Sequence, residues 1–168
     1  DLLIADEPTT ALDVTTQSQI LELLSSLQKQ NNMAILLITH DLGIVAERAD
    51  QVAVMYASRI VETSSAKDLF AEPMHPYTQG LLKSIPTLGC KDKRLYTIEG
   101  NVPNPLQFPT GCKFHPRCPL GCDDKRCQRA EPELRQIGDN RTVACWYAAG
   151  YETENERKEY EKKYGKRK

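Results

Sequence analysis

The chain opens with an apolar run, a helical pattern and a second apolar run. Leu2 to Ala5 are continuously apolar, which predicts a strand buried on both faces. Ile20, Leu23 and Leu27 recur at helical spacing with polar residues between them, so an amphipathic helix is expected next. The run Met33 to Ile38 predicts the following strand. A strand, a crossover helix and another strand form a parallel pair, which indicates an α/β fold.

Polar side chains follow both predicted strands. Asp6 and Glu7 come directly after the first apolar run, and Thr39 and His40 follow the second. Because parallel strands end at one sheet edge, we expect the two segments to converge where open sheets bind ligands. Paired carboxylates at this edge suit Mg²⁺-phosphate chemistry: Asp6 fits a metal ligand and Glu7 a base acting on water. The neutral imidazole of His40 could donate a hydrogen bond to a phosphate.

Beyond residue 40 the predicted elements become shorter. A helix over 41–49, a hairpin with strands over 51–56 and 59–62, and a helix over 66–70 are expected. Two prolines in the segment 72–77 then break the pattern.

Prolines and glycines are dense from Pro86 to Pro119, so no long regular element is expected there. A small core of this kind usually needs a covalent or metal staple. Four cysteines could supply it, separated by five, eight and seventeen residues: Cys112, Cys118, Cys127 and Cys145.

Composition narrows the function class. The 168 residues carry 22 basic and 23 acidic side chains, which gives no sign of a nucleic-acid partner. The sequence begins inside a predicted strand without Met and contains neither a signal peptide nor an apolar run that could span a bilayer, so a soluble fragment is expected. Six cysteines without a secretion signal favour a reducing compartment, where clustered thiols act as metal ligands more often than as disulfides.

The string LLIADEPTTALD followed by LLITHD resembles the second half of an ABC transporter nucleotide-binding domain, with its Walker B, D-loop and H-loop motifs in order. The resemblance implies that Asp6 holds Mg²⁺, Glu7 is the catalytic base and His40 contacts the γ-phosphate of ATP. It also implies that Asp13, in the D-loop, contacts the opposing subunit of a dimer that encloses ATP.

The string HPYTQGLLKSIP resembles the segment that opens the C-terminal extension of oligopeptide and dipeptide ABC ATPases. His75 and Tyr77 are family markers there without known chemistry, and we expect structural roles for both. The strings GCKFHPRCP and VACW, with Cys127 between them, resemble the four-cysteine pattern of the same extension. In dipeptide-type members this pattern is associated with an iron-sulfur cluster.

The identity of the metal and of one ligand stays open. Four thiolates can hold a [4Fe-4S] cluster, zinc is the alternative, and simple thiols or disulfides are a third reading. This chain has about two more residues than the family pattern between Cys118 and Cys127, and an additional Cys122 among them, so either Cys122 or Cys127 could be the third ligand. Cys90 lies outside the pattern and is expected to be a spectator.

The resemblance implies an architecture of three parts. Residues 1–64 would complete a P-loop NTPase core, 65–150 would form the small Pro/Cys-rich extension, and 151–168 a charged tail. The implied function is ATP hydrolysis that energises bacterial peptide import. The implied partners are a second ATP-binding subunit, in a homodimer or heterodimer, and membrane-spanning permeases, at the cytoplasmic face of the cell membrane.

The sequence lacks two motifs of the family, and other functions are open to it. The Gly-rich phosphate loop with its Lys and the signature motif do not occur in the sequence, so the chain alone is expected to be inactive. The alternatives are a regulatory or interaction module with a metal-responsive or redox-responsive cysteine lobe, and the ATPase of an importer for nickel or another small solute.

Overall fold

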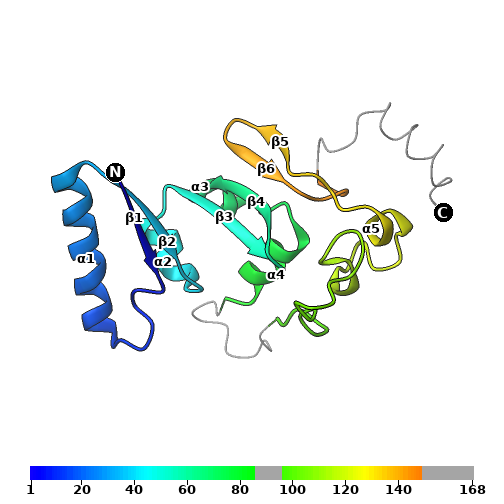
Figure 1. Cartoon of the computed structure of the whole chain (residues 1–168), viewed down its shortest axis with the longest axis horizontal. Coiled ribbons are helices and arrows are strands. Elements are labelled where there is room, and N and C mark those ends of the chain that lie inside the picture. The colour runs from blue at the N-terminus through cyan, green and yellow to red at the C-terminus, as the bar shows by residue number, and fades with distance from the viewer. Residues whose placement is uncertain (86–95, 149–168) are drawn as a thin grey trace. The chain divides into compact units, whose positions relative to one another are not determined.

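The computed structural model describes residues 1–85 and 96–148 (Figure 1). The chain divides into two compact units, Asp1–Val45 and the residues from Ala46 onward. The predicted spectator Cys90 and the predicted charged tail over 151–168 lie outside the described residues.

The first unit contains the predicted strand, helix and strand. Strand β1 (Leu2–Asp6) pairs in parallel with β2 (Ala34–Ile38), and helix α1 (Val14–Asn31) connects them. The prediction of a parallel pair is therefore confirmed. Helix α2 (Leu42–Arg48) follows β2 and crosses the boundary between the two units.

Strand β1 is not buried on both faces, so that prediction is wrong for the described residues. Leu2 and Ile4 keep 60% and 61% of their surface exposed, and Leu36 and Ile38 of the neighbouring strand are exposed as well. Successive side chains of a strand point to opposite faces, so these alternate positions define one open face of the sheet. The sheet has two strands in the described structure, and that face has no covering layer there.

The second unit is built on a four-stranded antiparallel sheet in the order β3-β4-β6-β5. Strands β3 (Gln51–Tyr56) and β4 (Arg59–Ser65) form the predicted hairpin. Ala57 and Ser58 both have positive φ, 48° and 61°, as a type I′ turn requires. The sequence did not indicate β5 (Arg135–Gly138) or β6 (Arg141–Val143), which extend the sheet beside β4.

The second unit also contains four short helices among its described residues. They are α3 (Ala66–Ala71), α4 (Pro76–Lys83), the 3-10 helix η1 (His115–Arg117) and α5 (Lys125–Arg129). Ser65, His75 and Asp124 cap three of them by accepting hydrogen bonds from first-turn backbone N–H groups.

Aromatic rings form the core of the second unit. The ring of Phe114 lies 5.1 Å from that of Tyr56, 5.5 Å from that of Tyr77 and 5.8 Å from that of His75. The edge-on and tilted arrangements are those that aromatic pairs prefer. Tyr77 and His75 thus join the loop-rich segment around Phe114 to the hairpin, in agreement with the structural roles expected for them.

The carboxylate of Glu62 is fully buried and satisfied by three segments. It accepts hydrogen bonds from the backbone N–H groups of Met74 and His75, each at 2.9 Å. Arg141 of β6 approaches one of its oxygens at 3.3 Å and also donates to the carbonyl of Glu72. A buried carboxylate is stable only with such partners, so Glu62 ties β4, the chain entering α4, and β6 together.

We expect Glu62→Ala to destabilise the second unit strongly. The change leaves two backbone N–H groups and a largely buried guanidinium without their acceptor, which typically costs about 3–5 kcal/mol. Urea unfolding followed by tryptophan fluorescence measures the loss. Glu99→Ala, at an exposed position of the same unit, is the matched control and should change stability by less than about 0.5 kcal/mol. A loss below about 1 kcal/mol for Glu62→Ala would contradict this role.

Candidate functional site

The carboxyl ends of β1 and β2 bring Glu7 and His40 together. The backbone N–H of Glu7 donates to the carbonyl of Ile38 at 2.8 Å, which extends the pairing of the strands beyond Asp6. Oε1 of Glu7 lies 3.1 Å from Nδ1 of His40. Two side chains 33 positions apart in the sequence therefore meet at the edge where the sequence analysis placed them.

A tight turn after β1 fixes the Glu7 carboxylate. Glu7 has a positive φ of 45°, and its carbonyl accepts from the backbone N–H of Thr10 at 3.1 Å. The Thr10 hydroxyl donates to Oε2 at 2.9 Å, so both carboxylate oxygens have a partner. The hydrogen bond from Thr10 and then that with His40 hold the pKa of Glu7 below its usual value. Glu7 is thereby kept ionised and oriented.

Thr10 is the residue that sequence reasoning missed. Its position three residues after Glu7, in a turn that contains Pro8, is the signal that could have identified it.

Asp6 is the last residue of β1, opposite Ile38, and its side chain is exposed. No other side chain of the described residues bonds to its carboxylate, so both oxygens are open to solvent. A free carboxylate at a strand end fits the hard oxygen ligand that Mg²⁺ prefers.

Asp13 does not join this group. Its carboxylate caps α1: Oδ1 accepts from the backbone N–H groups of Thr15 and Thr16 at 3.0 Å, and Oδ2 accepts from the Thr16 hydroxyl at 2.6 Å. The Thr16 hydroxyl is the main reason that the pKa of Asp13 is lowered. Both oxygens of the Asp13 carboxylate are therefore used as the N-cap of α1.

The structure gathers the four predicted cysteines in the second unit. Cys118, Cys127 and Cys145 are buried and Cys112 is partly buried, whereas Cys122 is exposed. Burial raises the pKa of both Cys127 and Cys145, and the neighbouring Cys112 and Cys118 raise it further. The neighbouring Cys122 likewise raises the pKa of Cys118 through the charge of its thiolate.

The thiols do not converge as metal ligands do. Within residues 1–85 and 96–148, no three side chains of His, Cys, Asp or Glu lie close enough to hold a metal ion, so a formed cluster or zinc site is not supported. Burial raises the pKa of all four thiols, that of Cys145 to about 11, so they are neutral at pH 7. Neutral thiols do not repel one another and pack as small apolar groups. All four are free.

None of the helices within residues 1–85 and 96–148 combines the length with the apolar character that crossing a bilayer requires.

The hydrogen bonds to the two acids lead to a test by titration. Thr10→Val removes the hydrogen bond that contributes most to the lowered pKa of Glu7, so the pKa of Glu7 should rise in this variant, as it should in His40→Ala. The lowered pKa of Glu7 stabilises the folded state at every pH above the pKa that Glu7 has in the unfolded chain. This stabilisation is lost as the pH falls through the pKa that Glu7 has in the folded state. Carbon-detected NMR of the carboxyl groups measures the pKa of Glu7 in both variants.

The matched control is Thr16→Val, which should raise the pKa of Asp13 and leave that of Glu7 unchanged. An unchanged pKa of Glu7 in Thr10→Val would show that the Thr10 hydroxyl does not bond to the Glu7 carboxylate in solution.

Comparison with known proteins places the chain. Residues 61–127 match the family described as "Oligopeptide/dipeptide transporter, C-terminal region". The chain is 53% identical over 145 residues to the oligopeptide transport ATP-binding protein AppD of Bacillus subtilis, an alignment that covers 86% of this chain and 44% of AppD. It is 54% identical over 144 residues to the dipeptide transport ATP-binding protein DppD of Haemophilus influenzae, covering 86% of this chain and 43% of DppD.

A third relative, the dipeptide transport ATP-binding protein DppD of Escherichia coli K12, is 51% identical over 146 residues, covering 87% of this chain and 44% of DppD. The chain thus spans somewhat less than half the length of these relatives. Residues 61–127 therefore belong to the oligopeptide/dipeptide transporter C-terminal region, and the chain is similar over most of its own length, at about half identity, to oligopeptide and dipeptide transport ATP-binding proteins.

Proposed function

We propose that this chain is part of the ATP-hydrolysing subunit of an importer for short peptides. The observation that carries the proposal is the contact of Glu7 with His40 at the carboxyl ends of two parallel strands. It occurs in a chain about half identical to proteins whose names specify oligopeptide and dipeptide transport and ATP binding. Those names favour a peptide cargo over nickel or another small solute.

The three side chains at this edge divide the chemistry. Asp6, with both oxygens open, would hold Mg²⁺, which supplies charge neutralisation on the phosphates when bound. Glu7 accepts the proton of the attacking water, and its contacts with Thr10 and His40 keep it ionised and aimed. Nδ1 of His40 donates to the ionised carboxylate of Glu7, so the second ring nitrogen, Nε2, can donate to a γ-phosphate oxygen only when the ring is doubly protonated.

Asp6, Glu7 and His40 supply the metal side and the water side of an ATPase centre. The side chains of His40 and Glu7 are 77% and 46% exposed, whereas phosphoryl transfer needs a site from which bulk water is excluded. We therefore infer that the remaining part of the whole protein, and a second ATP-binding subunit near Asp13, close over this edge. Permease subunits at the cytoplasmic face of the membrane complete the proposed importer.

In the whole protein, Glu7→Gln should preserve the shape of the side chain and ATP binding but remove the base. We expect turnover to fall by about two to four orders of magnitude, the usual contribution of general base catalysis. Phosphate release measured under saturating Mg-ATP is the readout. Glu22→Gln, at an exposed position of α1, is the matched control and should retain normal turnover. Near-normal turnover of Glu7→Gln would remove Glu7 from this role.

A second proposal concerns Cys112, Cys118, Cys127 and Cys145. We propose that they bind a [4Fe-4S] cluster, with zinc as the alternative. The backbone N–H of Cys112 donates to the carbonyl of Cys127 at 2.8 Å, and this contact between the segments of two of the four cysteines supports the proposal. Ligation requires thiolates, so binding at these neutral, buried thiols would release protons.

Protein purified without oxygen should contain iron and acid-labile sulfide at about four of each per chain if the cluster forms. Cys127→Ser should abolish the iron, because a ligand is lost. Cys122→Ser is the matched control and should keep it, since Cys122 is exposed and distinct from the buried set. Stoichiometric zinc without iron would select the alternative, and the absence of both metals would leave the four residues as packed thiols.

A further inference from the structure

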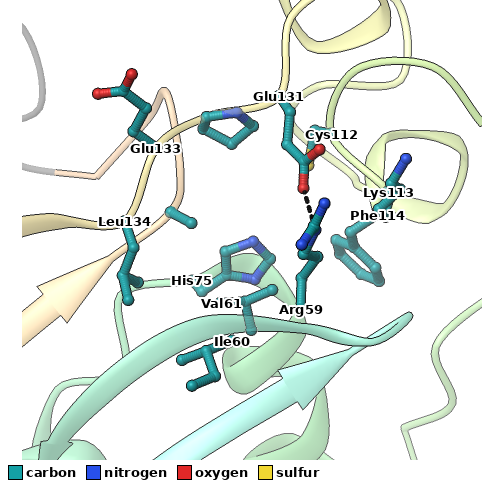
Figure 2. A pocket seen from close by; sticks show the side chains of 12 residues that line it. Arg59, Ile60, Val61, His75, Cys112, Lys113, Phe114, Glu131, Glu133 and Leu134 are labelled. Atoms are coloured by element: carbon teal, nitrogen blue, oxygen red, sulfur yellow. Dashed lines mark hydrogen bonds and ion pairs between the residues drawn. The ribbon is translucent and has the colours of Figure 1, made fainter.

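A cavity of about 350 Å³ lies in the second unit, between β4 and the segment that precedes β5 (Figure 2). Residues 59–61 of β4 line one side, and residues 131–134 line another. Cys112 lines the cavity as well, and Figure 2 shows its side chain near Glu131. One thiol of the four-cysteine set, which is only partly buried, therefore borders this cavity.

The cavity is open to solvent at one end. Ile60 and Leu134, which line it, keep 41% and 43% of their surface exposed, whereas the lining residues His75 and Phe114 are buried. The volume lies near the lower end of the range typical of small-molecule sites. A small reagent can therefore approach Cys112 without unfolding of the second unit.

A second cysteine of the set lies across a backbone contact from Cys112. The backbone N–H of Cys112 donates to the carbonyl of Cys127 at 2.8 Å, and the Thr110 hydroxyl donates to the carbonyl of Gln128 at 2.9 Å. Gly111 has a φ of 68°, and a Cβ at this position would lie 2.3 Å from the carbonyl oxygen of Cys127. Because only glycine permits this approach, the two backbones are held in direct contact.

This contact gives Cys112 and Cys127 the backbone spacing of a disulfide pair. Residues joined by backbone hydrogen bonds across two strands have Cα atoms about 5.5 Å apart. Disulfides connect residues whose Cα atoms are about 4.4–6.8 Å apart. Both thiols are free, and Cys127 is buried and does not line the cavity, so a reagent in the cavity meets Cys112 first.

We propose that Cys112 is a modification site for small disulfides and that Cys127 resolves the modified form. The Cys112 thiolate attacks one sulfur of the reagent, whose S–S bond breaks, and the released half leaves as a thiol with the proton that Cys112 loses. The Cys127 thiolate then attacks the Cys112 sulfur, and the second half leaves as a thiol with the proton of Cys127. The two cysteines lose two electrons and two protons, and the reagent gains both.

This modification does not depend on the metal proposal and stands if that proposal fails. A cysteine in a disulfide has no thiolate that could ligate a metal ion. The bond between Cys112 and Cys127 and a metal at the four cysteines therefore exclude each other.

Hydroxyethyl disulfide, a small uncharged disulfide, is the probe. The chain carries Cys90→Ser and Cys122→Ser, so that the two cysteines outside the set do not react, and a chelator is present. Burial raises the pKa of Cys112, which slows the reaction, so the incubation runs for hours at pH 8. Mass spectrometry of proteolytic peptides should find a bond between Cys112 and Cys127, and a thiol reductant should reverse it.

Two variants separate the two steps. Cys127→Ser should stop after the first step and keep one half of the probe on Cys112, because the resolving thiol is missing. Cys145→Ser is the matched control, since Cys145 is also a buried cysteine of the set, and it should still form the bond between Cys112 and Cys127.

A second pair of variants tests the route through the cavity. Leu134→Trp should narrow the cavity and slow the modification of Cys112 at least fivefold. Leu120→Trp is the matched control, because Leu120 is exposed in the same unit but does not line the cavity, and its rate should be unchanged. If a cysteine variant loses its fold by circular dichroism, the Leu134 and Leu120 variants decide the question.

Four results would overturn the proposal. They are the absence of any reaction of Cys112 in the folded chain, a bond from Cys112 to Cys118 or Cys145 in place of Cys127, a mixed disulfide that persists on Cys112 although Cys127 is present, and an unchanged rate in Leu134→Trp.

Discussion

The second unit depends on one buried carboxylate. Glu62 lies inside a strand, yet it is fully buried and serves two backbone N–H groups and a guanidinium from segments far apart in the sequence. The cost of burying the Glu62 carboxylate is offset because its hydrogen bonds also satisfy these donors, which would otherwise lack an acceptor. By fixing the N–H of His75, Glu62 sets the start of α4 and the place of the imidazole beside Phe114. The aromatic core and the cavity are therefore consequences of a polar contact.

The sequence allowed the position of the candidate site to be predicted but not all of its contacts. Two apolar runs joined by a helical pattern leave little choice of topology, and the parallel pairing of the strands then brings Glu7 and His40 to one edge. The Thr10 contact depends on the turn that gives Glu7 its positive φ, which periodicity does not report. Asp13 shows the same limit, because an acid before a helix can serve a partner or cap the helix, and here it caps.

Long-range pairing was the hardest feature to predict. Strands β5 and β6 are four and three residues long, too short to give an alternating pattern, and β6 pairs with β4 about 80 residues earlier in the chain. The cysteines were easier to group than to interpret. The resemblance singled out four of the six cysteines, but whether thiols ligate a metal depends on their ionisation, which burial opposes here.

The open face of the β1–β2 sheet affects how the chain behaves in solution. Leu2, Ile4, Leu36 and Ile38 form a contiguous apolar patch on a parallel pair, and a two-stranded sheet is only marginally stable without a covering layer. Molecules that meet through this patch would bury it in each other, so self-association should grow with concentration. The edge that holds Glu7 and His40 belongs to the same two strands. Light scattering in dilute and concentrated samples would measure this self-association, which involves the two strands that carry Glu7 and His40.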